Sequence, residues 1–152
     1  MLTVDRPIDL KAHVGEVLGV SEWRTVTQQA IDDFAANSGD DHWIHVDVER
    51  ASREMPGGRT IAHGLYLLSL APALQREIYT IKNRGRGLNY GYDRLRFVAP
   101  VPVESRIRLK QTLAEATEHR SGMRLAFDEE IEIEGSEKPA LVVRHILLIE
   151  NP

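Results

Sequence analysis

One segment of this sequence constrains the fold more than any other, because the stretch Ile61–Ala73 would be apolar on nearly every side of a helix. A helix that is apolar all round is buried, so the rest of the chain has to cover it. We expect this helix to run to Tyr79, with Pro72 kinking it by removing one backbone hydrogen bond. Only its last turns are polar, at Gln75, Arg76 and Glu77.

The second half of the chain predicts a sheet that could cover the helix. Apolar and polar residues alternate over residues 107–113 and 123–133, and a period of two is typical of half-buried antiparallel strands. Residues 141–149 predict a more continuously apolar strand, and residues 88–97 predict a weaker one. One buried helix followed by a run of strands is an α+β layout rather than a βαβ one.

The first half of the chain predicts shorter elements. We expect a strand over residues 22–26. Thr25 or Thr27 can then cap a helix, and Thr25-Val-Thr-Gln28 fits the capping-box pattern. That helix should end at Asn37-Ser38-Gly39, where helix-breaking residues cluster. The loop Asp40–Asp47 follows, and its final residue should cap a short helix over residues 48–54.

The composition limits what the chain can do. Its 152 residues predict a single domain, 1–152, and 42% hydrophobic with 28% charged residues is ordinary for a globular protein. A net charge of -4 argues against nucleic acid or an anionic membrane as the main partner. The sequence has no cysteine, which excludes disulfides and thiolate catalysis. The N-terminus lacks an apolar signal core, and Leu65–Leu74 is too short to span a bilayer, so we expect a cytoplasmic location.

The loop Asp40–Asp47 carries a carboxylate and an imidazole five residues apart, at Asp40 and His45. If Trp43 and Ile44 hold this loop against the protein, both groups can converge on one water, with one group taking its proton and the other protonating carbon. Partial drying by the same side chains would raise the pKa of the carboxyl and keep the imidazole neutral. The spacing alone is equally compatible with a structural role, in which Asp40 caps a turn and His45 is a hydrogen-bonded core residue.

A second polar feature lies at the start of the buried helix, where His63 precedes Gly64. Free N–H groups at a helix start attract negative charge, and a glycine lets a ligand oxygen approach its N–H closely. A thioester carbonyl held there would be stabilised as enolate charge develops, which is the charge that forms when water adds to a conjugated double bond. The alternative role of Gly64 is close packing of the helix on the sheet.

Together these features resemble the MaoC-like dehydratase and (R)-specific enoyl-CoA hydratase family, in its short single-domain, NodN-like branch. Phe34–Asp47 is similar to the family signature, in which a helix ends in Ser-x-Asp, four residues intervene, and His-x-Asp follows. Ile61–Ser69 is similar to the central-helix motif, with a serine five residues after the glycine. Asn89-Tyr-Gly91 and Arg96–Pro102 resemble further segments of this branch. Many members have Asn-Pro where His42-Trp43 stand here, a departure that concerns substrate size more than chemistry.

The resemblance implies a hotdog fold, in which a curved antiparallel sheet wraps around the long central helix. It also implies a homodimer, usually with the two sheets joined edge to edge. It assigns catalysis to Asp40 and His45, and binding of the substrate oxygen to the backbone N–H of Gly64. Ser69 and His63 are expected as further substrate-binding groups near this pair.

The reaction implied by the resemblance is the reversible addition of water to a trans-2-enoyl thioester, which gives an (R)-3-hydroxyacyl thioester. His45 would deprotonate the water and Asp40 would protonate C2, although the sequence leaves the reverse assignment open. The acyl carrier would be coenzyme A or acyl carrier protein, and no metal or other cofactor is required. Lys82, Arg84 and Arg86 follow the helix, and they would either contact the coenzyme A phosphates or form a solvated loop.

Three other interpretations remain open from the sequence. A metal site could be formed by Asp40, Asp41, His42, His45 and Asp47, although no motif such as H-E-x-x-H supports one. A hotdog thioesterase would also use a carboxylate and a helix start, but the Asp-to-His spacing followed by His-Gly favours a hydratase. A non-catalytic acyl-binding subunit would lack one catalytic residue, whereas both Asp40 and His45 are present.

Overall fold

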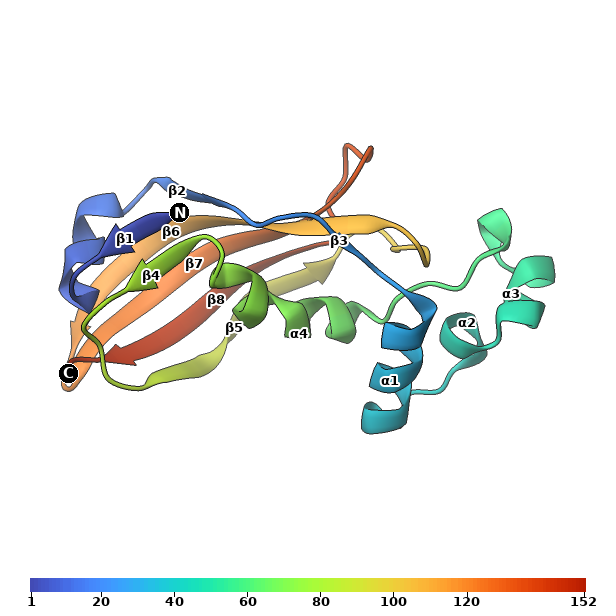
Figure 1. Ribbon diagram of the computed structural model, residues 1–152, viewed down its shortest axis with the longest axis horizontal. Coiled ribbons are helices and arrows are strands. Elements are labelled where there is room, and N and C mark those ends of the chain that lie inside the picture. The colour runs from blue at the N-terminus through green and yellow to red at the C-terminus, as the bar shows by residue number, and fades with distance from the viewer.

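A six-stranded antiparallel sheet curves around one central helix, and the computed structural model describes all residues, 1–152 (Figure 1). The strand order is β2-β6-β7-β8-β5, and β3 also pairs with β6. This arrangement confirms the predicted α+β layout. The strands of this sheet are β2 (Val17–Val20), β3 (Arg24–Thr25), β5 (Gly87–Phe97), β6 (Arg106–His119), β7 (Gly122–Ile133) and β8 (Leu141–Glu150).

The alternating pattern separates an apolar inner face of the sheet from a charged outer face. Arg108 on β6 lies opposite Glu132 on β7, and their side chains form an ion pair at 2.6 Å. On the other face, Leu109 lies opposite Ile131, and both side chains are fully buried. A shift by one residue would exchange the two faces, so burial fixes the register, whereas each exposed ion pair contributes at most about 1 kcal/mol.

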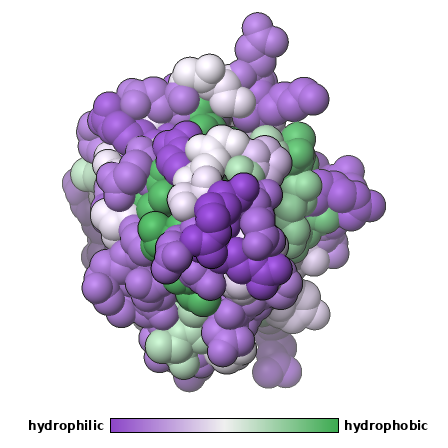
Figure 2. Space-filling model, turned by 90° about the vertical axis from the view of Figure 1, so that its right-hand side faces the viewer, coloured by the Kyte–Doolittle hydropathy of each residue, from purple (hydrophilic) through white to green (hydrophobic).

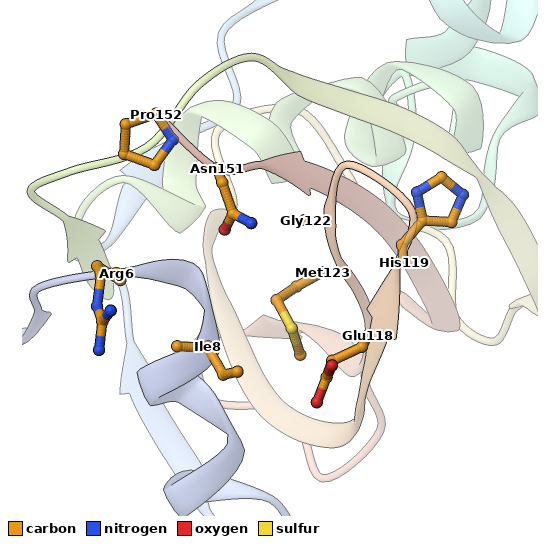
Figure 3. Close-up of a pocket in the computed structure, with 8 residues that line it drawn as sticks. All are labelled: Arg6, Ile8, Glu118, His119, Gly122, Met123, Asn151 and Pro152. Atoms are coloured by element: carbon orange, nitrogen blue, oxygen red, sulfur yellow. The ribbon is translucent and has the colours of Figure 1, made fainter.

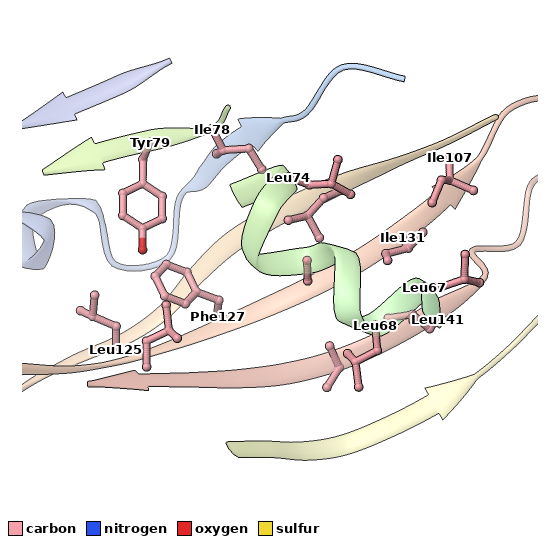
Figure 4. Close-up of a cluster of buried hydrophobic side chains, with 14 of the residues drawn as sticks. Leu67, Leu68, Leu74, Ile78, Tyr79, Ile107, Leu125, Phe127, Ile131 and Leu141 are labelled. Atoms are coloured by element: carbon pink, nitrogen blue, oxygen red, sulfur yellow. The ribbon is translucent and has the colours of Figure 1, made fainter. Parts of the chain in front are cut away.

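The hydrophobic core lies between the inner face of the sheet and α4 (Gly64–Gln75) (Figure 4). Leu67 and Leu74 of α4 pack in the same buried cluster as Phe127 and Ile131 of β7. Burial of a side chain of this size stabilises the fold by about 1.5–3 kcal/mol. The predicted buried helix is therefore the element that the sheet covers.

The end of α4 differs from the prediction. The helix continues through Pro72 but ends at Gln75, so the expected extension to Tyr79 is wrong. Tyr79 instead begins β4 (Tyr79–Ile81), which pairs in parallel with β1 (Leu2–Val4). None of the helices has the length and apolar character needed to cross a bilayer.

The N-terminal third supplies the smaller elements. A 3-10 helix, η1 (Pro7–His13), follows β1, and the strand predicted over residues 22–26 is reduced to the two residues of β3. Thr27 caps α1 by accepting a hydrogen bond from the Ala30 amide at 3.2 Å. Of the two expected caps, Thr27 is therefore confirmed, and the capping box starting at Thr25 is wrong. The remaining helices gather at one end of the molecule (Figure 1): α1 (Gln28–Ser38), α2 (Trp43–Val46), α3 (Val48–Glu54) and the 3-10 helix η2 (Pro56–Gly58).

Strand β5 forms a free and irregular edge of the sheet. It pairs only with β8, and its register shifts twice, between Asn89 and Gly91 and between Asp93 and Arg96. Arg94, within the second irregularity, has a φ of 54°. Such bulges bend a strand and increase its twist. Its exposed apolar side chains include Leu88, Tyr90 and Phe97.

Candidate active site

Asp40 lies in the turn between α1 and α2, and His45 lies within α2. α1 ends at Gly39, whose φ of 80° is a left-handed conformation that glycine adopts readily. Asp40 follows with its amide donated to Ser38 Oγ at 3.2 Å, and its exposed carboxylate makes no hydrogen bond within the chain. The helix α2 is capped by His42 rather than by Asp40, so Asp40 has no capping role.

His45 is held in one orientation by two contacts. Its Nδ1 donates to the carbonyl of Ile61 at 2.7 Å, which leaves Nε2 as the free acceptor. Gln28 clamps the backbone at this point, because its Nε2 donates to the His45 carbonyl at 2.8 Å and its Oε1 accepts from Thr60 Oγ1 at 2.5 Å. Burial lowers the pKa of His45, with smaller opposing contributions from the Ile61 hydrogen bond and from Asp40. The imidazole is therefore neutral near pH 7 and able to accept a proton.

His63 joins the pair at the start of α4. Its Nε2 donates to the Asp40 carbonyl at 2.8 Å, and its ring stacks on the ring of His45 with centroids 3.7 Å apart. The polar atoms offered by Asp40, His45 and His63 all lie within 4.8 Å of one another. Because two hydrogen bonds of roughly 2.8 Å can span this distance, one water can contact both the carboxylate and the imidazole.

The same three side chains form the one cluster in the chain that could hold a metal ion. His45 Nδ1 and His63 Nε2 already contact carbonyl oxygens, so each ring has a single nitrogen left for a ligand. The metal site considered from the sequence is not formed, since His42 caps α2 and Asp47 caps α3. That no metal is required stays a prediction.

Gly64 begins α4 beside an apolar pocket of about 290 Å³, which His45, Leu67 and Phe97 also line. A Cβ placed on Gly64 would lie 2.5 Å from the ring of Phe97, so no larger residue fits unless that ring moves. The close-packing role considered for Gly64 is therefore present. The Gly64 amide also stands at the first helical position, where no preceding turn supplies an acceptor.

Ser69 makes no hydrogen bond to the catalytic pair. It lies five residues beyond Gly64 on α4, is exposed, and donates its hydroxyl to the Tyr66 carbonyl at 2.6 Å. It does not line the pocket beside Gly64. Its role as a substrate-binding group stays a prediction.

The basic cluster lies at the other end of α4. Lys82, Arg84 and Arg86 occupy the loop between β4 and β5, on the side of the molecule opposite the start of the helix (Figure 1). Arg86 is engaged by Glu150 through two hydrogen bonds of 2.9 Å. The expected phosphate contacts to a substrate at Gly64 are therefore not available within one chain.

Three residues of the site were missed by the sequence analysis. Gln28 was assigned only to a capping box, and Phe97 lies in Arg96–Pro102, a stretch that was noted only for its resemblance to the family. Phe34 packs against His63 with ring centroids 4.9 Å apart. It is the first residue of the stretch that resembles the family signature, so that resemblance was an available signal.

The surroundings of the site are mainly polar. Seen from the end formed by the short helices, hydrophilic side chains cover most of the surface, and apolar ones show only in narrow strips (Figure 2).

A separate pocket of about 380 Å³ lies at the opposite end, where residues such as Arg6, Glu118 and Met123 surround it (Figure 3). None of the predicted site residues lines that pocket.

The fold and the site together define the class of protein. The structure resembles the unliganded R-hydratase PhaJ1 from Pseudomonas aeruginosa with a TM-score of 0.77 and 18% identity, over 97% of this chain and 86% of that one, which supports the hotdog fold. The MaoC like domain matches residues 9–132. The chain therefore belongs to the MaoC-like dehydratase family, as the sequence motifs predicted.

Two relatives in this family cover nearly the whole chain. The 3-hydroxyacyl-thioester dehydratase Z of Mycobacterium tuberculosis is 43% identical over 148 residues, 97% of each chain. Nodulation protein N of Rhizobium leguminosarum bv. viciae is 41% identical over 144 residues, 93% of this chain and 89% of that one. The second relative agrees with the resemblance to the NodN-like branch.

Proposed function

We infer that this protein is a 3-hydroxyacyl-thioester dehydratase, a hydro-lyase that reversibly adds water to trans-2-enoyl thioesters in the manner of an (R)-specific enoyl-CoA hydratase. The observation that carries this inference is the convergence of Asp40 and His45 within 4.8 Å of each other beside the start of α4. The 43% identity to a 3-hydroxyacyl-thioester dehydratase over 97% of the chain supports the same reaction.

His45 acts as the base in the hydration direction. Its Nδ1 proton is committed to the Ile61 carbonyl, so Nε2 takes the proton from water while the oxygen attacks C3. Asp40 delivers a proton to C2 in the same step. The proton then on His45 returns to Asp40 through the solvent-accessible side of the pair, which restores both groups for the next turnover.

Gly64 stabilises the charge that develops during this step. With the thioester oxygen on the Gly64 amide, the negative charge of the enolate forms at the positive end of the α4 dipole. The acyl carrier is coenzyme A or acyl carrier protein, and no metal or redox cofactor takes part. The (R) configuration of the product is the one expected from the family resemblance.

A crotonyl-CoA assay tests this function directly. Loss of the conjugated enoyl absorbance without release of free thiol is expected, whereas thiol release would indicate a thioesterase. Asp40→Asn and His45→Gln should each reduce kcat by about 10²–10⁴-fold with the fold intact. Asp41→Asn is the matched control, because it removes a neighbouring exposed carboxylate that lies outside the cluster. Full activity in either catalytic variant would refute the assignment.

The active unit is a homodimer joined along the β5 edges. Exposed apolar side chains on this edge support such a contact, with Tyr90 68% and Phe97 51% exposed in the single chain. Two β5 strands related by a two-fold axis run antiparallel, so the start of one strand lies beside the end of the other. This brings the loop holding Arg84 and Arg86 of one copy toward the Phe97 end of the other copy, where coenzyme A phosphates could reach it.

Measurement of mass in solution tests the dimer. Light scattering should give twice the 17.2 kDa of one chain. Tyr90→Lys should shift the mass toward the monomer, since it puts a charge into the proposed contact while changing an exposed side chain. Arg120→Glu, an exposed change outside β5, should leave the mass unchanged. A monomeric and fully active wild type would refute the dimer.

A further inference from the structure

A row of buried polar residues crosses the inner face of the sheet. Gln111 on β6, Glu129 on β7 and His145 on β8 are each at most 1% exposed, in rows that otherwise hold apolar side chains. His145 Nδ1 donates to Glu129 Oε1 at 2.9 Å, and Gln111 Nε2 donates to the same oxygen at 2.7 Å. Removing a carboxylate and an imidazole from water is costly, and apolar residues of similar size would serve packing equally well. The row therefore suggests a role beyond packing.

This row has unused hydrogen-bonding capacity. Glu129 Oε2 and Gln111 Oε1 are both buried acceptors without a partner in the chain. Buried polar atoms are nearly always satisfied, since an unpaired one keeps its full desolvation penalty. Both atoms therefore favour a donor that comes from outside the chain.

A pocket of about 470 Å³ adjoins the row, between the last turns of α4 and strands β4, β5 and β8. Neutral polar side chains, two arginines and apolar side chains share its lining, which includes Gln75, Tyr79, Asn89, His145, Arg76, Arg84 and Leu147. Gln75 connects the pocket wall to the buried row, because its Oε1 accepts from Gln111 Nε2 at 2.9 Å and its Nε2 donates to Tyr79 Oη at 2.9 Å. Burial raises the pKa of Tyr79, so its hydroxyl keeps a proton that it can donate into the pocket.

His145 and Asn89 add further hydrogen-bonding groups to the pocket wall. His145 Nε2 lies 3.2 Å from Asn89 Oδ1, and Asn89 Nδ2 donates to Tyr92 Oη at 2.6 Å. The ring of Tyr92 stacks on His145 with centroids 4.7 Å apart. The wall of the pocket thus both donates and accepts hydrogen bonds, in contrast to the apolar pocket beside Gly64.

The two pockets lie along the same side of α4. The pocket beside Gly64 uses the first turns of α4 and the end of β5, and the polar pocket uses the last turns of α4 and the start of β5. Gly64 and Gln75 are separated by about 16 Å along the helix axis at 1.5 Å per residue. Along α4, Leu68 and Ala71 of the core cluster lie between the residues of the two pockets.

We propose that the polar pocket receives the far end of the substrate's acyl chain, and that the preferred substrates carry a hydroxyl group there. The proposal rests on the proposed function and names its substrate class. A hydroxyl both donates and accepts, so it can accept from Tyr79 and donate to an acceptor of the pocket wall, such as Asn89 Oδ1. A methyl end would leave the polar groups of the pocket wall without a partner in the substrate.

The experiment compares trans-2-enoyl-CoA substrates of increasing length, each with either a methyl or a hydroxyl on the terminal carbon, on the full chain. At the length that reaches the pocket, kcat/KM for the hydroxyl-ended substrate should exceed that for its methyl-ended match by at least about tenfold. Crotonyl-CoA is too short to reach the pocket, so its hydration tests the proposed function alone. Hydration of crotonyl-CoA with no hydroxyl preference at any length would overturn this proposal while the function stands; no hydration of any substrate would overturn both.

A triple variant tests the residues. Gln111→Leu, Glu129→Leu and His145→Leu together replace the buried row with apolar side chains, and the hydroxyl preference should be lost or reversed. The matched control is the pair His13→Leu and Glu16→Leu, because this second His–Glu contact, at 2.8 Å, lies outside the pocket; it should keep the preference. His145→Gln alone retains hydrogen bonding and should lower the hydroxyl preference. This single variant replaces the triple variant as the test if the triple variant does not fold. Retention of the full preference in a folded triple variant would refute the proposal.

Discussion

Replacement of Gly64 by alanine separates the steric role of this position from its electrostatic role. The added methyl would lie 2.5, 2.6 and 2.9 Å from three ring atoms of Phe97, distances at which the ring has to move. The backbone N–H of residue 64 is unchanged by the substitution. Any loss of activity in Gly64→Ala would therefore arise from displacement of Phe97 and obstruction of the pocket rather than from loss of the amide donor.

The expected magnitude follows from the overpacking of residue 64 against Phe97. Overpacking of a core costs about 1–3 kcal/mol, and the added methyl lies close enough to the Phe97 ring to require that the ring moves. A destabilisation of about 1 kcal/mol lowers the Tm of a domain of this size by about 2–4 °C. Thermal unfolding followed by circular dichroism measures the change, together with kcat/KM for crotonyl-CoA.

A double-mutant cycle decides whether this reasoning is right. Phe97→Ala removes the ring, so adding Gly64→Ala to it should cost little further stability and should restore part of the kcat/KM lost in Gly64→Ala. The coupling energy between the two substitutions should be about 1 kcal/mol. An unchanged Tm in Gly64→Ala, or an equal loss of stability in both backgrounds, would refute the steric account.

Three further predictions concern the catalytic pair and its support. Because burial lowers the pKa of His45 below 6.5, kcat/KM should be constant near neutrality and fall at acidic pH with a midpoint below 6.5. The free energy of unfolding should also decrease as pH falls from 6.5, since the unfolded chain takes up this proton first. A midpoint above 6.5 would contradict both expectations. His63→Phe keeps an aromatic ring against His45 but loses the hydrogen bond to the Asp40 carbonyl, so kcat should fall by roughly 10²-fold with little change in KM, whereas wild-type turnover would show that the contact does not position Asp40. Thr27→Ala should cost about 1 kcal/mol by removing the cap of α1, measured by denaturant unfolding, and Thr25→Ala should cost much less; equal costs would mean that the cap is misassigned.

The long elements of the fold could be predicted because each has a pattern that repeats. Alternation over 107–113 and 123–133 fixes which face of β6 and β7 is buried, and the apolar stretch after Gly64 identifies the central helix. The short strands β1 and β4 have three residues each, too few to establish a period. They form because they pair with each other across the chain, and this pairing is also why α4 stops at Gln75 instead of continuing to Tyr79.

The candidate site was predictable where its residues are local and unpredictable where they are not. Asp40 and His45 are only five residues apart in the sequence, so their spacing indicated a possible catalytic pair. The contacts that complete the site link distant segments, such as Gln28 to Thr60 and Gly64 to Phe97. For the basic residues at 82–86, the sequence left phosphate contacts and a solvated loop as alternatives. The structure places these residues at the end of α4 that is far from Gly64.

The two register shifts in β5 bear on how selectively this edge can be used. A straight, unpaired edge strand offers its amides and carbonyls to any extended peptide and can seed aggregation. The β5 edge is interrupted at Asn89–Gly91 and again at Asp93–Arg96, so it offers only short stretches of regular backbone. An arbitrary strand therefore cannot pair with it by hydrogen bonds along its whole length. A partner whose edge has the same irregularities, as an identical subunit does, can still match it, and the bulges would then act as a filter against foreign strands.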